Sequence, residues 1–149
     1  ILDSGRIGVA AQAVGIAQAS LDEALTYSQE REQFGRPIAS FQAVKHKAAD
    51  MMLQTEVARS GTYYAACVAA EALGGGPMGG ELHEAASVAK SYCSDAYFAV
   101  AGEALQLHGG VGFTWEYDVH LYFKRAKSSE LLFGDPTYHR EQLAQRIGI

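Results

Sequence analysis

Three long stretches with apolar residues at every third or fourth position constrain this chain more than any other feature of its sequence. They run over about 3–32, 41–73 and 81–107, and all are rich in alanine. Apolar residues at this spacing share one face of a helix, so each stretch predicts a long amphipathic helix. Two shorter helices are expected over 119–129 and 138–147. No segment indicates a strand, and the predicted fold is therefore all-α, an antiparallel four-helix-type bundle.

Glycine and proline mark the connections between these helices. Phe34-Gly35-Arg36-Pro37 ends the first helix, because proline cannot continue a helix and restricts the residue before it. The glycine-rich segment 74–80 predicts a flexible connection, since no Gly-Lys-Ser/Thr follows it as in a phosphate-binding loop. Gly109, Gly110 and Gly112 end the third helix, either as an ordinary glycine cap or as bare backbone for close approach to a partner.

Each helix carries a predicted buried stripe, and the first is expected to be capped by Asp3 or Ser4. The first stripe comprises Ile7, Ala11, Val14, Leu21 and Leu25. The second comprises Val44, Ala48, Met51, Thr55, Ala58, Thr62 and Ala65, widened by Met52, Leu53 and Val57. The third comprises Leu82, Ala86, Ala89, Cys93, Ala96 and Val100, widened by Tyr92, Tyr97 and Phe98. Cys67 and Cys93 are expected to be buried free thiols.

Length and charge limit the classes of function. A chain of 149 residues is expected to form one domain, and its net charge of −5 argues against a general nucleic-acid binder. No apolar run reaches the roughly 18 residues that span a bilayer. The histidines and cysteines are scattered without metal-ligand spacing, and no nucleophile motif is present, so neither a metal site nor a catalytic triad is predicted. Because the chain begins at Ile1 with the helical pattern already under way by Arg6, it is expected to be a piece of a longer polypeptide.

Two blocks of sequence resemble the C-terminal domain of the acyl-CoA dehydrogenases. The first is Arg31-Glu32-Gln33-Phe34-Gly35, followed by Phe41-Gln42 and Ala49-Asp50-Met51. The second is Gln106-Leu107-His108-Gly109-Gly110-Val111-Gly112-Phe113, followed by Glu116-Tyr117 and the basic run 124–127. Both blocks occur in the family's order and spacing, and the resemblance covers essentially the whole chain. It implies a single helical C-terminal domain over 1–149, without the N-terminal α and middle β domains of the family.

The resemblance also implies an FAD site and a substrate cleft. Arg6 and Gly134 match the acyl-CoA cleft, and the flavin site is shared with a neighbouring subunit. Taken alone, Arg6 could equally be an exposed first-turn arginine, and Arg31 could either stabilise the end of a helix or clamp a phosphate. The residues that match the family's flavin contacts are Arg31, Gln33, Phe34, Phe41, Gln42, Gln106, Leu107, His108, Gly109 and Gly110.

The family's reaction is α,β-dehydrogenation of an acyl-CoA thioester, in which a carboxylate removes the α-proton while flavin takes the β-hydride. The family places this base at one of two positions, which are Phe133 and Gly5 in this chain, and neither side chain can accept a proton. Three explanations stay open. The chain is the base-less subunit of a hetero-oligomer, Asp135 is a displaced base, or the protein is a non-catalytic flavin-binding or oligomerisation scaffold.

The sequences of residues 107–116 and 124–134 are similar to the actinobacterial steroid and lipid branch of the family, in which paired subunits occur. The resemblance therefore implies a role in fatty acid or steroid degradation, in the cytoplasm, with an electron-accepting flavoprotein or a similar acceptor as partner. It also implies a homo- or hetero-oligomer, dimer or tetramer, formed through the helical domain. The acyl chain of the substrate cannot be read from this sequence.

Overall fold

Five α-helices carry the fold of the chain, which a computed structural model describes over all of residues 1–149. The helices are α1 (Leu2–Glu30), α2 (Gln42–Gly74), α3 (Leu82–His108), α4 (Val119–Leu131) and α5 (Pro136–Arg146). Short 3₁₀ turns link them, namely η1 (Ile38–Ser40), η2 (Pro77–Glu81) and η3 (Gly109–Phe113). Two two-residue strands, β1 (Glu32–Gln33) and β2 (Arg36–Pro37), join α1 to η1.

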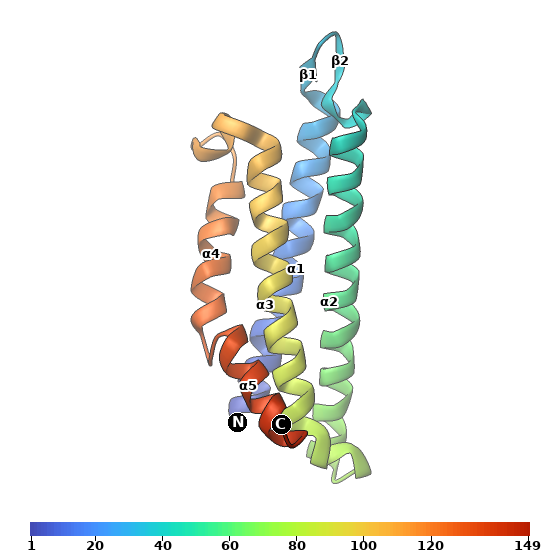
Figure 1. The fold of residues 1–149 in the computed structure, drawn as a ribbon, viewed down its shortest axis with the longest axis vertical. Helices are drawn as coiled ribbons and strands as arrows, with labels where there is room; N and C mark the ends of the chain where they lie inside the picture. The colour runs from blue at the N-terminus through green and yellow to red at the C-terminus, as the bar shows by residue number, and fades with distance from the viewer.

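The helices run alternately up and down along one long axis (Figure 1). α1, α2 and α3 form three full-length columns, whereas α4 and α5 follow one another along α3 and together take the place of the fourth column. The predicted all-α, antiparallel four-helix-type bundle is therefore confirmed. Both chain termini lie at one end of the bundle, and the β1–β2 hairpin lies at the other.

The core is lined mainly by alanine. Ala10, Ala13, Ala17 and Ala24 of α1 are buried, and so are six alanines of α3, Ala85, Ala86, Ala89, Ala96, Ala101 and Ala104. α1 packs against α3 more extensively than any other two elements pack together. Side chains this small let the two helix backbones approach closely, and that contact forms the centre of the bundle.

The predicted stripes are correct in part. Five of the six stripe residues of the third helix are buried, but Leu82 is only half-buried and Tyr92 is 40% exposed. Ala11 and Leu25 of α1 are exposed, whereas alanines between them are buried. In α2, Met51, Thr55, Ala58 and Ala65 are buried, but Met52, Leu53 and Val57 are 59, 64 and 44% exposed. The reason is that α2 packs only against α1 and α3, at the edge of the bundle, so a narrow face is covered. Cys93 is buried as expected, but Cys67 is exposed.

Three local predictions were wrong. α1 begins at Leu2, so Asp3 and Ser4 lie inside the helix and neither caps it. The Asp3 carboxylate instead accepts a hydrogen bond from Arg6. The connection over 74–80 contains the ordered turn η2. The expected absence of strands is also wrong, since Glu32 pairs with Pro37 and Gln33 with Arg36. Phe34 and Gly35 between them have φ of 56° and 74°, which are the left-handed values that a tight two-residue hairpin turn requires.

The turn between α4 and α5 is held from below by buried polar side chains. Lys90 of α3 is completely buried, and its ammonium donates to Ser94 Oγ at 2.9 Å and to the carbonyls of Glu130 and Gly134, both at 3.0 Å. Burial lowers the pKa of Lys90, and the nearby Glu130 carboxylate partly opposes that shift. The ammonium therefore has an acceptor for each of its three protons.

His139 of α5 completes the support of this turn. It is also completely buried, and its Nε2 lies 3.1 Å from the carbonyl oxygen of Phe133. A carbonyl can only accept, so Nε2 carries the proton and donates. Burial and the nearby Arg6 guanidinium lower the pKa of His139, because both disfavour the imidazolium. His139 is therefore neutral at pH 7.

A first prediction tests the alanine-lined contact. Replacing Ala17, which is 1% exposed, by leucine should lower the free energy of unfolding in urea by about 1–3 kcal/mol, because the larger side chain forces α1 away from its neighbours. The matched control is Ala11→Leu on an exposed position of the same helix, which should change it by less than about 0.5 kcal/mol. Equal effects of the two changes would contradict close packing at Ala17.

A second prediction concerns acid. The pKa of His139 is lowered in the folded state, so below its unfolded value of 6.5 the unfolded chain binds a proton that the folded chain does not. Stability should therefore fall as the pH drops below 6.5. In His139→Gln, whose amide can still donate to Phe133, this acid loss should be shallower by at most about 1.4 kcal/mol per pH unit. Urea unfolding at pH 7.0 and 5.5 measures the difference, and parallel losses in both proteins would contradict the assignment.

Candidate functional site

At the hairpin end of the bundle, the residues of the first motif form an exposed group. Arg31 follows the last turn of α1 in extended conformation, with φ −74° and ψ 119°. Its guanidinium takes part in none of the seven ion pairs of the chain. Gln33 is exposed, and its amide donates only to the neighbouring Glu32 carbonyl. A cation and an amide are thus free to meet a ligand at this end.

Phe34 is the most unusual residue of this group. Its side chain is 93% exposed, and its backbone is held at a φ of 56°, which is costly for a bulky residue. Its ring meets that of Phe41 edge to face, with centroids 6.2 Å apart, and the Arg36 guanidinium lies 4.1 Å from the Phe41 ring centre. An exposed aromatic residue in a strained turn is a feature more typical of binding surfaces than of packing.

The second motif lies at the same end of the bundle, where α3 ends. Gln106, Gly109 and Gly110 are exposed, and Leu107 is half-buried. His108, in contrast, is buried: its ring stacks on Tyr27 with centroids 4.2 Å apart, and its Nδ1 donates to the Ala104 carbonyl. The imidazole of His108 thus anchors the glycine turn to α1, and only its backbone lies near the exposed group.

The structure constrains the three glycines of this turn to different degrees. Gly109 has a φ of 63°, and a Cβ on Gly112 would lie 2.8 Å from that of His108. Gly110 has neither constraint, because no atom lies within 4 Å of the place where its Cβ would be. A cavity of about 460 Å³ adjoins the turn, lined by Gly102, Leu105, Gln106, Gly109, Phe113 and Phe123. The Gly109 N–H is bonded to the carbonyls of Leu105 and Gln106, so the turn offers a ligand exposed backbone without side chains beside the cavity.

Arg6 and Gly134 meet at the opposite end of the bundle. They line a cavity of about 270 Å³ together with Leu2, Phe133 and Tyr138. Arg6 is only 6% exposed, which rules out a simple exposed first-turn arginine. Its Nη1 donates to Asp3 at 2.8 Å, His83 Nδ1 lies 3.0 Å from the same carboxylate, and its buried Nε has no partner.

Phe133 and Gly5, the two positions without a carboxylate, are in contact. A Cβ on Gly5 would lie 3.2 Å from two carbons of the Phe133 ring. The backbone of Phe133 also has a φ of 60°, so this turn is strained like the hairpin. The ring thus fills the place beside the cavity at which either position would present a side chain.

Asp135 has a structural role in this turn. Its Oδ1 accepts a hydrogen bond of 2.7 Å from the backbone N–H of Tyr138, and it is the N-cap of α5. Asp135 is also not among the residues that line the cavity beside Arg6.

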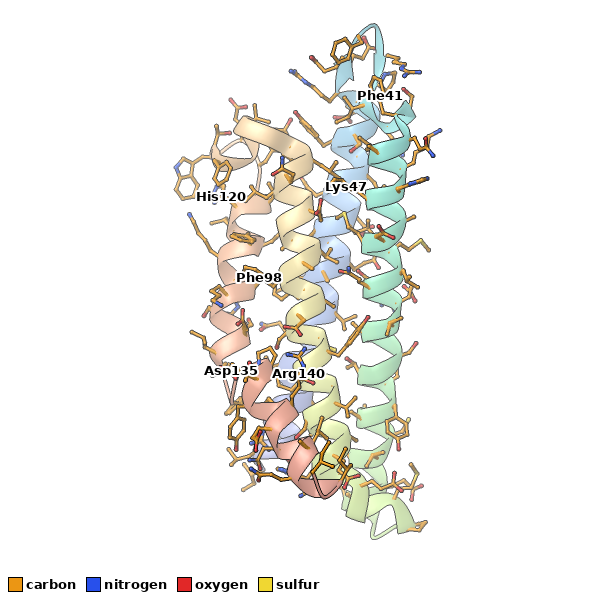
Figure 2. All side chains as sticks on the ribbon, in the orientation of Figure 1. Phe41, Lys47, Phe98, His120, Asp135 and Arg140 are labelled. Carbon is orange, nitrogen blue, oxygen red and sulfur yellow. The ribbon has the colours of Figure 1, made fainter.

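The two groups are far apart. Figure 2 shows Phe41 at the hairpin end and Asp135 toward the other end of the bundle. Along α1, the 25 residues from Arg6 to Arg31 rise by roughly 38 Å. A single copy therefore brings together the candidate flavin residues at one end and the candidate substrate residues at the other.

Lys90, His139 and the aromatic pair Tyr27 and Tyr117 were missed at the sequence level. Tyr117 packs edge to face on both Tyr27 and His108, so these rings hold the glycine turn in place. Lys90 lies on the buried stripe between Ala86 and Cys93, and a lysine in that register was the signal that could have found it.

No group of three or more His, Cys, Asp or Glu side chains is arranged to hold a metal ion. None of the helices is long and apolar enough to cross a membrane.

Comparison with known proteins supports the resemblance. The family model described as acyl-CoA dehydrogenase, C-terminal domain, matches residues 1–148. Acyl-CoA dehydrogenase IpdE2 of Mycolicibacterium smegmatis is 39% identical over 143 residues, which are 96% of this chain and 41% of that protein. This chain thus spans less than half of the length of that relative.

Solved structures agree in fold. Butyryl-CoA dehydrogenase from Megasphaera elsdenii matches with a TM-score of 0.84 and 41% identity, over 94% of this chain and 35% of that one. The Tcur3481-Tcur3483 steroid ACAD G363A variant matches with a TM-score of 0.88 and 34% identity, over 98% and 38%. A mycobacterial protein and a steroid enzyme among the matches agree with the expected actinobacterial branch. The chain belongs to the acyl-CoA dehydrogenase family, whose C-terminal helical domain it represents.

Proposed function

We propose that this chain forms the helical part of an FAD-dependent acyl-CoA dehydrogenase that oxidises an acyl-CoA thioester between its α and β carbons. The observation that carries the proposal is the hairpin end, where the free guanidinium of Arg31 and exposed amides lie at the same end of the bundle as a cavity lined in part by Gln106 and Gly109. These groups suit a dinucleotide, because phosphates take charged and backbone donors and adenine takes flat surfaces. Family membership supports FAD as that dinucleotide.

Each proposed flavin residue has a chemical task. Arg31 neutralises phosphate charge, and the Gln33, Gln42 and Gln106 amides supply directional hydrogen bonds. Phe34 and Phe41 offer aromatic faces, and Gly109 and Gly110 let backbone approach the ligand. Leu107 and His108 contribute through backbone and packing. When bound, FAD accepts the β-hydride as the double bond forms.

The distance between the two ends supports an oligomer. Hydride transfer requires flavin and substrate to be in contact, yet the two groups lie at opposite ends of the same bundle. The two ends of one copy then belong to two different active sites, and each site is completed by a second chain, in a dimer or tetramer. Surfaces outside residues 1–149 complete the flavin site in the same way. An electron-accepting partner would take the electrons from the assembled enzyme, and an electron-transfer flavoprotein is the expected class.

At the substrate end, the residues of this chain bind and shape but do not remove a proton. Arg6 and Gly134 border the thioester cavity, and the Phe133 ring forms part of its wall. The α-proton of the substrate must pass to a carboxylate, and we propose that a partner subunit supplies it. The absent base equally fits a scaffold that binds flavin without catalysis, and the partner experiment below separates the two.

A third prediction tests the flavin end. Replacing Arg31 by methionine in the intact, assembled protein should weaken FAD binding by about tenfold or more, because a charge-assisted hydrogen bond to phosphate is lost. The flavin absorbance per chain after dialysis measures it. The matched control is Arg59→Met, midway along α2, which should retain full flavin. A wild-type assembly that carries no flavin would refute the dehydrogenase proposal and favour the scaffold.

A fourth prediction tests the base. Homogeneous, FAD-loaded protein should not reduce its flavin with an acyl-CoA, and a partner subunit that carries the carboxylate should restore flavin reduction. Asp135→Asn should leave the restored rate unchanged, since asparagine caps a helix as well as aspartate does. If the homogeneous protein is active and Asp135→Asn abolishes activity with FAD retained, Asp135 is the base. If no partner restores flavin reduction, the scaffold alternative holds.

A further inference from the structure

Lys90 lines neither cavity, and the proposed function does not use it. It nevertheless places a charged group where none of its surface reaches solvent. Nothing on its own helix explains the charge, because Ser94 Oγ, at 2.9 Å, takes only one of its three protons. The other two go to backbone carbonyls of the turn that follows α4.

Those two carbonyls stand on either side of the strained turn. Glu130 precedes it and Gly134 ends it, and between them Phe133 has a φ of 60° and Gly134 a φ of 103°. The Phe133 carbonyl is held separately by His139 from α5. Because a left-handed phenylalanine is unfavourable without support, the conformation of this turn depends on the buried donors that hold it.

The α4–α5 turn also forms one wall of the substrate-end cavity. Phe133 and Gly134 line that cavity beside Arg6, and the Phe133 ring rests against Gly5 of α1. A shift of the Glu130 and Gly134 carbonyls would therefore move the Phe133 ring. A methionine at position 90 would fill much the same volume but could not hold these carbonyls, so packing alone does not account for the lysine.

We propose that Lys90 is a positioning residue of the thioester cavity: its ammonium fixes the α4–α5 turn so that the Phe133 ring closes the cavity against Gly5. The identity of the ligand rests on the proposed function, whereas the hold of Lys90 on the turn does not.

The experiment compares Lys90→Met with wild type in the intact, assembled, FAD-loaded protein labelled with 4-fluorophenylalanine. The fluorine resonance of Phe133 is assigned with Phe133→Leu. It should shift or broaden in Lys90→Met, while those of Phe34 and Phe41 at the hairpin end stay unchanged. Binding of butyryl-CoA, followed by the flavin spectrum, should weaken by about tenfold or more at unchanged FAD content, because a small misplacement of a cavity wall is costly.

Lys127→Met is the matched control. Lys127 is a lysine of α4 that pairs with the Glu130 carboxylate, so its loss removes the same charge near the same turn without touching a carbonyl. It should leave the Phe133 resonance and butyryl-CoA binding as in wild type. If Lys90→Met does not fold, Lys90→Gln keeps an amide donor of smaller reach and is judged by the same two signals.

Two results would overturn the proposal. One is a folded Lys90 variant with an unchanged Phe133 resonance, and the other is a shifted resonance with unchanged affinity for butyryl-CoA. A wild type that binds no butyryl-CoA would instead count against the proposed function. In that case the fluorine comparison alone still decides whether Lys90 holds the turn.

Discussion

The close contact of α1 with α3 is the constraint on which the rest of the structure depends. Both helices present alanines where they are buried, and this brings their backbones together along most of the bundle. The other elements are arranged around that pair. α2 covers one side, and α4 with α5 covers another. The hairpin and the glycine turn both lie at the end where α1 and α3 finish, so this pair of helices sets the spacing of the two motifs proposed to bind flavin.

The same pair separates two kinds of chemistry. Charged and amide groups that are open to solvent gather where α1 and α3 end, whereas Arg6, Lys90 and His139 are buried toward the other end. A buried cation is costly unless it is hydrogen-bonded. The cations Arg6 and Lys90 and the neutral His139 each hold a defined neighbour in place. One end is thus built to receive a ligand from outside, and the other to keep a small cavity in shape.

Much of the fold could be read from the sequence because helical spacing and glycine breaks are local signals. The five helices and the positions of their breaks were predicted within a few residues. The exposure of Met52 and Leu53 was not predicted, because the number of sides of α2 that are covered depends on its place in the bundle. The two-residue strands were missed because they extend no alternating pattern.

The candidate site divides in the same way. The motifs identified which residues gather at each end, but not that His108 is turned inward or that Asp135 caps α5. Those facts depend on contacts between residues distant in sequence, such as His108 with Tyr27. The role of Lys90 depends on carbonyls 40 and 44 residues further along the chain, and no local pattern reports them.

Because the Phe133 ring contacts Gly5, the substitutions that are tolerated at one of these positions depend on the residue at the other. A Cβ at Gly5 would already crowd that ring, so a large residue is tolerated at only one of them at a time. A carboxylate can therefore migrate between the turn and the helix only through an intermediate in which the other position is small. In this chain the Phe133 ring occupies the shared space. An acidic residue in place of Gly5 would therefore first require a smaller residue in place of Phe133. The Phe133 ring and the missing Cβ of Gly5 thus form one steric unit.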